Sequence, residues 1–198
     1  FRQFYQQPEL TLPAFELSFR DYVLVEQQIK DSPLYKQSRD YWLQQLPELP
    51  GTPELPLAIN PATLEQPKFV QKNHFLPKAD WSKLKARAAQ EQITPSCLLM
   101  TAFSDILRGW CKQDSFTINL TAYNRQALHP QVNDLIGDFT SVILLGIDNP
   151  EQHSFIERAH NIQKRLWNNL NHNHFSGIEV LRELGKRNGH KPGAQMPV

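Results

Sequence analysis

The sequence predicts an α/β fold in which a mixed sheet packs against helices. Segments with apolar residues at helical spacing alternate along the chain with short β-branched runs, a pattern typical of this class. A proline-rich stretch at 47–67 separates the first helical segment from the rest. The 198 residues are 40% hydrophobic and 21% charged, which is ordinary for a globular domain. We therefore divide the chain into a helical segment at 1–46, a strap at 47–67 and an α/β part at 68–198.

The first segment is predicted to be helical over residues 15–46. Apolar and aromatic side chains fall at helical spacing, namely Phe19, Tyr22, Val23, Ile29, Tyr35, Tyr41, Trp42 and Leu46. Ser32-Pro33 predicts a break and restart, because serine favours the N-cap and proline the first helical position. The strap holds six prolines, at Pro47, Pro50, Pro53, Pro56, Pro61 and Pro67. Proline fixes φ and removes a donor, so we expect an extended, semi-rigid connection between two lobes.

After the strap we expect elements in the order βααββαα. Lys68–Phe75 is predicted to be a strand, and a helix is expected from about Asp80. The next helix is better marked, because Thr94 suits the N-cap and Pro95 the first helical position. Its wide apolar stripe predicts a largely buried helix. The stripe comprises Leu98, Leu99, Ala102, Phe103, Ile106, Leu107 and Trp110.

The remaining elements are two strands and two helices. Phe116–Tyr123 alternates apolar and polar side chains, which predicts a half-buried strand, and Phe139–Leu145 predicts a buried one. A helix over 151–171 carries an apolar stripe, and a capping box at 176–179 predicts a short helix that stops at Gly185. Lys186–Val198 is expected to be a loop.

Three collinear motifs carry a family resemblance. Residues 49–61 follow an LPxxPxLPLxxxP pattern, residues 94–110 follow TPSxxLxxAFxxxLxxW, and residues 137–145 follow GDFTxxxLL. Together they resemble the heterocyclization domains of nonribosomal peptide synthetases, a branch of the condensation-domain family. The resemblance implies a chloramphenicol-acetyltransferase-like lobe for 68–198, with 1–46 ending a first lobe.

The resemblance also implies a function and partners. Such domains condense a carrier-bound acyl or aminoacyl group with cysteine, serine or threonine and then cyclodehydrate the product to a thiazoline or oxazoline. We expect no directly bound cofactor. The expected partners are peptidyl or aryl carrier proteins with their phosphopantetheine arms and neighbouring synthetase domains, in a bacterial cytoplasm, with siderophore synthesis as one setting. The family's DxxxxD motif would precede residue 1, and its PVVFTS-like strand would begin near Pro197, so we expect an inactive internal fragment. An ordinary condensation lobe and a non-catalytic carrier-docking module remain alternatives.

The loop between the two late strands holds the candidate site residues. Polar groups at a strand end, held by a rigid sheet, are typical of functional sites. Asn124 is the candidate catalytic residue, as a hydrogen-bond partner of the substrate amide. The resemblance implies a tunnel wall for the other motif residues, which are Arg125, His129, Asp138, Thr140 and Ser141.

Five of these six candidates also have a structural alternative, the exception being His129. Asn124 could serve only as a turn residue, because asparagine tolerates the left-handed conformation. Arg125 could form an ion pair with a nearby carboxylate, such as that of Asp134 or Asp138. Asp138 is better suited to fixing the loop through backbone donors than to acting as a base. Thr140 and Ser141 alternate across the strand, so only one of them can face a cleft.

Other functional classes find little support in the sequence. A net charge of +1 without a basic cluster excludes an electrostatic footprint for nucleic acid, and the longest apolar run is too short to span a membrane. We expect no metal site at the histidines, which are His153, His160, His172 and His174. Cys97 and Cys111, roughly 21 Å apart on one helix, cannot pair. Trp42, Trp81, Trp110 and Trp167 are predicted to be core residues.

Overall fold

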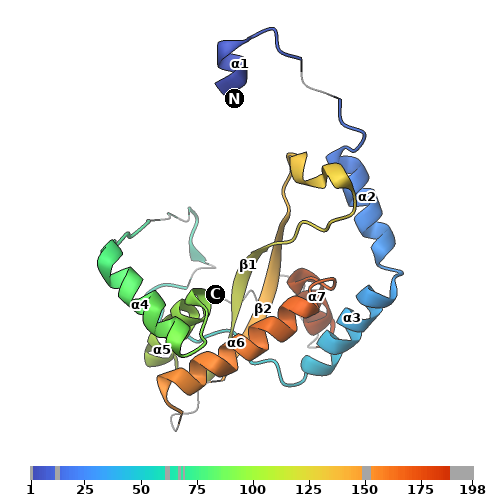
Figure 1. The fold of residues 1–198 in the computed structure, drawn as a ribbon. Coiled ribbons are helices and arrows are strands. Elements are labelled where there is room, and N and C mark those ends of the chain that lie inside the picture. Colours follow the sequence, from blue (N-terminus) through green and yellow to red (C-terminus); the bar gives the residue numbers. More distant parts are fainter. Residues whose placement is uncertain are drawn as a thin grey trace.

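The computed structural model describes residues 2–11, 14–60, 63–66, 68, 70–148 and 153–187. At its centre lies a ribbon of two antiparallel strands, β1 (Ser115–Tyr123) and β2 (Thr140–Asp148). Helices α2 (Phe19–Ile29) and α3 (Pro33–Gln45) lie on one side of the ribbon (Figure 1). Helices α4 (Lys78–Gln90) and α5 (Pro95–Trp110) lie on the other. The ribbon thus connects two groups of helices.

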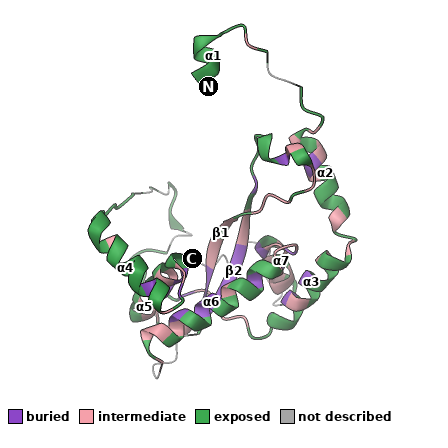
Figure 2. Ribbon diagram, viewed as in Figure 1, coloured by how far each residue is buried: buried purple, intermediate pink, exposed green. Residues whose placement is uncertain are grey.

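Two further helices pack directly on the ribbon. Helix α6 (Phe155–Asn171) runs across it, and α7 (Gly177–Arg187) lies beside β2 (Figure 1). The short helix α1 (Arg2–Gln6) stands apart, and a 3-10 helix, η2 (Pro130–Asp134), lies in the loop between the strands. Buried residues gather along the ribbon and the facing side of α6 (Figure 2). One such cluster contains Leu107, Phe116, Ile118, Leu145, Ile147 and Ile162.

Local sequence signals set the helix ends as predicted. The side chains of Ser32 and Thr94 accept hydrogen bonds from the backbone three residues ahead, and a proline follows each of them. Ser176 and Glu179 form the predicted capping box of α7. Helix α2 begins at Phe19 rather than at residue 15, because Ser18 and Asp21 form a further capping box there.

The predicted strand at Lys68–Phe75 is absent from residues 68 and 70–75, and the ribbon is antiparallel rather than mixed. A further strand would have to pair with an outer edge of the ribbon, and both outer edges are partly occupied. On β2, the Leu144 carbonyl accepts from Asn169 Nδ2 at 2.8 Å, and the Gly146 carbonyl accepts from the Arg165 guanidinium. On β1, the Thr117 N–H donates to the Gly51 carbonyl in the strap at 2.8 Å.

Helix α5 is less buried than its apolar stripe predicts. Leu99, Phe103, Ile106 and Trp110 are 48–66% exposed, because α6 and α4 cover only the opposite face. Trp110 on α5 and Trp167 on α6 are exposed, so the prediction that they are core residues is wrong. Trp42 is buried as predicted. Helix α7 continues past the predicted stop at Gly185 to Arg187, and residues 188–198 of the expected tail lie outside the described part.

Candidate active site

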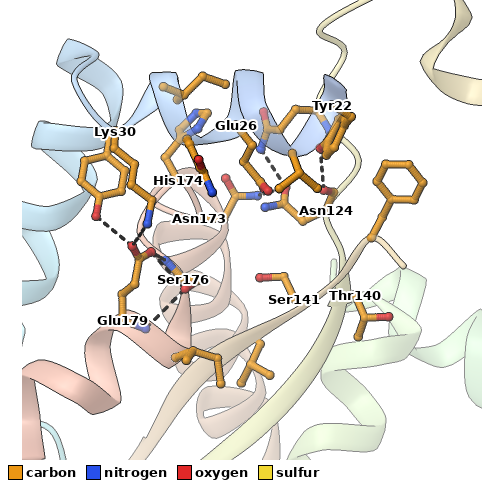
Figure 3. Close-up of a pocket in the computed structure, with 18 of the residues that line it drawn as sticks. Tyr22, Glu26, Lys30, Asn124, Thr140, Ser141, Asn173, His174, Ser176 and Glu179 are labelled. Carbon is orange, nitrogen blue, oxygen red and sulfur yellow. Dashed lines mark hydrogen bonds and ion pairs between the residues drawn. The ribbon is translucent and has the colours of Figure 1, made fainter. Parts of the chain in front are cut away.

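A cavity of about 420 Å³ lies between α2, the start of β2 and the N-terminal end of α7. Of the predicted site residues, Asn124, Asp138, Thr140 and Ser141 line it, whereas Arg125 and His129 do not. Ser141 is turned toward the cavity and Thr140 away from it, as the alternation along β2 requires (Figure 3). Four of the six residues singled out from the sequence therefore lie together at one wall of this cavity.

Asn124 follows β1 directly and is held through its backbone. Its N–H donates to the Phe139 carbonyl at 2.9 Å, which extends the ladder of the ribbon by one step. Its side-chain Oδ1 accepts from Gln126 Nε2 at 2.8 Å and lies 3.4 Å from Asn173 Nδ2. Among the described residues, Nδ2 of Asn124 makes no hydrogen bond, so this amide group presents a donor at the cavity wall.

Arg125 supports the loop from behind the cavity. Its guanidinium lies 4.0 Å over the centre of the Phe139 ring and donates to the carbonyls of Asn133, at 2.7 Å, and Leu135, at 3.1 Å. Within the described part of the chain it forms no ion pair, so the alternative of pairing with a local carboxylate is wrong. A flat guanidinium that stacks on an aromatic ring and binds two carbonyls fixes the path of the loop.

His129 and Asp138 also shape the loop. Nδ1 of His129 accepts from the Gln131 N–H at 3.2 Å and caps η2. The Asp138 carboxylate accepts from the Thr140 N–H at 2.9 Å. Hydrogen bonds from the hydroxyl and backbone of Thr140 lower the pKa of Asp138, which keeps it ionised and makes it a poor proton acceptor. This agrees with the interpretation that Asp138 fixes the strand entry.

The opposite wall holds a cluster that the sequence did not reveal as a site. Oε1 of Glu179 accepts from Lys30 Nζ at 3.0 Å and Tyr35 Oη at 2.9 Å, and Oε2 accepts from the Ser176 N–H at 3.0 Å (Figure 3). The capping box identified Ser176 and Glu179 only as a helix start. Their partners, Lys30 at the C-cap of α2 and Tyr35 on α3, lie more than a hundred positions away, so no local pattern indicates them.

Electrostatics in this cluster favour charged Glu179 and neutral Tyr35. Burial raises the pKa of Glu179, but the hydrogen bonds from Ser176, Lys30 and Tyr35 outweigh it, so its pKa is lowered overall. Burial, together with the bond to Glu179, raises the pKa of Tyr35 to about 12. The cluster therefore ties α2 and α3 to α7 across the cavity mouth at neutral pH.

The described residues contain no group of three metal-ligating side chains, and no described helix is long and apolar enough to cross a membrane. Cys97 is buried and Cys111 half-buried, and the two free thiols lie at opposite ends of α5. Burial raises the pKa of the Cys97 thiol, so it is a weak nucleophile.

A family model described as the Condensation domain matches residues 1–192. The chain belongs to the condensation-domain family. Bacitracin synthase 1 of Bacillus licheniformis is 42% identical over all of this chain, which spans 4% of that protein. Pyochelin synthetase PchF of Pseudomonas aeruginosa is 40% identical over 95% of this chain and 10% of its own length. The resemblance to the condensation-domain family of nonribosomal peptide synthetases, inferred from the three motifs, is confirmed.

Solved structures support the predicted fold of condensation domains. The EpoB cyclization-docking bidomain from Sorangium cellulosum matches with a TM-score of 0.86 and 42% identity, over all of this chain and 40% of that one. The first condensation domain of the calcium-dependent antibiotic synthetase matches with a TM-score of 0.72 and 17% identity, over 97% of this chain and 40% of that one. The second likeness shows the shared fold alone. This chain spans less than half the length of each of these proteins.

Proposed function

We propose that the chain is part of a heterocyclization domain within a nonribosomal peptide synthetase. Such a domain joins a carrier-bound acyl or aminoacyl group to carrier-bound cysteine, serine or threonine. It then closes the side chain onto the new amide and removes water, which gives a thiazoline or oxazoline.

One observation carries this proposal. The chain is 42% identical over its whole length to a structure described as a cyclization domain, but 17% identical to one described as a condensation domain. Phenyloxazoline synthase MbtB of Mycobacterium tuberculosis, 33% identical over 89% of this chain and 13% of its own length, is named for an oxazoline product. The similarity therefore favours ring formation over simple peptide-bond formation.

Ring closure requires the protein to stabilise the amide oxygen while the new bond forms. The side-chain sulfur or oxygen forms a bond to the amide carbon, the carbonyl π bond opens onto oxygen, and the nucleophile's proton ends on that oxygen. The hydroxyl then leaves with the former amide proton as water, and a C=N bond forms. Negative charge develops on the amide oxygen during the first step, so a fixed hydrogen-bond donor there lowers the barrier.

Asn124 supplies such a donor in this proposal. No described residue accepts from its Nδ2, whereas the oxygen of the same amide already accepts hydrogen bonds. Arg125, His129 and Asp138 keep the loop that carries Asn124 in place. Ser141 lines the cavity beside it, whereas Thr140 is turned away and belongs to the strand (Figure 3). The main contribution of these residues is positioning rather than proton transfer.

The cavity is proposed to lie between two lobes. Residues 1–46 would end the first lobe, 47–67 would form the strap, and 68–198 would belong to the second, so that α2 faces the sheet across the substrate. Carrier proteins would deliver both substrates on phosphopantetheine arms, and neighbouring synthetase domains would load them. Neither nucleic acid nor membrane has a place in this scheme.

Reconstitution of the full-length synthetase with loaded carrier proteins tests the proposal. We expect a product that has lost water relative to the linear amide, detected by mass spectrometry. Accumulation of the linear amide alone would favour an ordinary condensation domain, which the family model also describes. Absence of any new amide would favour a docking module. The isolated 198 residues are expected to be inactive, because one part of a tunnel cannot exclude water.

A further inference from the structure

Three residues from different elements converge on the Asn124 side chain and its backbone. Gln126 Nε2 donates to Oδ1 at 2.8 Å, and Asn173 Nδ2, just beyond α6, lies 3.4 Å from the same oxygen. Tyr22 on α2 donates its hydroxyl to the Asn124 carbonyl at 3.4 Å. Figure 3 shows Tyr22, Asn124 and Asn173 around one end of the cavity.

Gln126 is itself held in place. Its N–H donates to Tyr22 Oη at 2.9 Å, and Tyr22 is only 3% exposed. The Tyr22 ring packs edge-on against Phe139, with centroids 4.9 Å apart. Gln126 therefore reaches Asn124 from a rigid, buried support rather than from a mobile loop.

The contacts favour one direction of the Asn124 amide. A carbonyl oxygen offers two lone pairs, and two amide donors face Oδ1 of Asn124. A flipped Asn124 amide would point its Nδ2 at the donors of Gln126 and Asn173, so both neighbouring amides would have to turn with it. The network therefore favours the orientation in which Nδ2 is the group left for a ligand.

We infer that Gln126 is a positioning residue, which holds Asn124 so that its Nδ2 donates to the oxygen of the substrate amide. This inference rests on the proposed ring closure and names the substrate atom, which is the carbonyl oxygen and not the amide N–H. Loss of one neutral hydrogen bond should slow ring closure by about 3- to 10-fold. Loss of the donor itself should cost more, about 10²- to 10³-fold.

The test uses the full-length synthetase and follows linear amide and ring separately. Gln126→Leu keeps the approximate side-chain volume and removes the donor. We expect slower ring closure, unchanged amide formation and an unchanged melting temperature. Gln131→Leu is the matched control: Gln131 lies in the same loop, but its side chain accepts from the Glu16 N–H and does not touch Asn124. Its ring closure should equal that of the wild type.

A double-mutant comparison separates positioning from general support of the fold. If Gln126 acts through Asn124, Gln126→Leu combined with Asn124→Ala should be no slower than Asn124→Ala alone. Multiplying effects in the double variant would overturn the inference. If Gln126→Leu fails to fold, Gln126→Glu replaces it. A glutamate carboxylate faces Oδ1 with acceptors, so ring closure should fall at neutral pH and recover as the pH is lowered and the carboxyl regains a donor.

The inference and the proposed function fail in different ways. A wild-type synthetase that makes only linear amide would refute the proposed function. A wild-type synthetase that forms the ring while Gln126→Leu and Gln126→Glu close it at the wild-type rate would refute the role of Gln126 alone.

Discussion

The glycine of the Gly137-Asp138 turn makes room for an aromatic ring from the far end of the chain. A Cβ at Gly137 would lie 2.5 Å from Phe19 Cε2 and closer still to Cδ2. Real Cβ atoms do not approach that closely, so in Gly137→Ala the Phe19 ring must move. That ring packs edge-on against Phe139, with centroids 5.3 Å apart, and stacks on Tyr22 at 6.2 Å.

The size of the effect follows from these contacts. Each aromatic pair contributes roughly 0.5–1.5 kcal/mol beyond its buried area. Loss of both pairs would therefore cost about 1–3 kcal/mol, which is also the usual cost of overpacking. Because the contacts hold α2 against the loop, we expect this free energy to appear in the local opening of α2. Amide hydrogens of Phe19–Ile29 should exchange about 5- to 150-fold faster.

Hydrogen exchange measured by mass spectrometry on the full-length synthetase tests this. Gly109→Ala is the matched control, because a Cβ at Gly109 meets nothing within 4 Å. In helix α5 this change should be neutral or slightly stabilising. The variant Gly137→Ala with Phe19→Ala should be no worse than Phe19→Ala alone. Wild-type protection of α2 in Gly137→Ala would refute the steric argument.

Three further predictions concern the cavity and its surroundings. Asn124→Ala in the synthetase should slow ring closure about 10²- to 10³-fold and leave the linear amide to accumulate, with an unchanged melt; unaltered turnover would leave Asn124 as a turn residue. The pKa of Glu179 is lowered, so its contribution to stability is present at neutral pH and is lost as the pH falls through its folded value. The protection of α7 amides, taken relative to their intrinsic exchange at each pH, should therefore fall on acidification, and Glu179→Gln should flatten that pH dependence. Buried Asn169 binds the Leu144 carbonyl and the Tyr41 hydroxyl, so Asn169→Ala should destabilise α6 and β2 by about 1–3 kcal/mol, and exchange at wild-type rates would contradict this.

Local chemistry made much of the fold predictable. Helix starts at Pro33, Pro95 and Gly177 follow from a capping residue and its neighbours within four positions, and the alternation of Phe116–Tyr123 reports one sheet face. These signals depend on short stretches of chain, so they hold whatever surrounds them.

The parts that the sequence did not predict depend on distant partners. An apolar stripe predicts that α5 has something to bury, but not that Phe103 and Trp110 remain exposed in this structure. The strand expected at Lys68–Phe75 depends on a free sheet edge, which pattern alone does not reveal. The site followed the same division: Asn124 was found because it ends a strand, whereas Glu179 depends on helices more than a hundred residues away.

The covered edges of the ribbon decide where its sheet can grow. Along β2, α6 side chains occupy the carbonyls of Leu144 and Gly146, and the start of α7 presses so closely on Val142 that a Cβ at Gly177 would lie 2.6 Å from its carbonyl oxygen. On β1, the strap takes the edge at Thr117. The contacts of α6 and α7 therefore oppose the pairing of a further strand with residues 142–146 of β2. A sheet edge covered in this way cannot pair edge to edge with another copy of the same sheet.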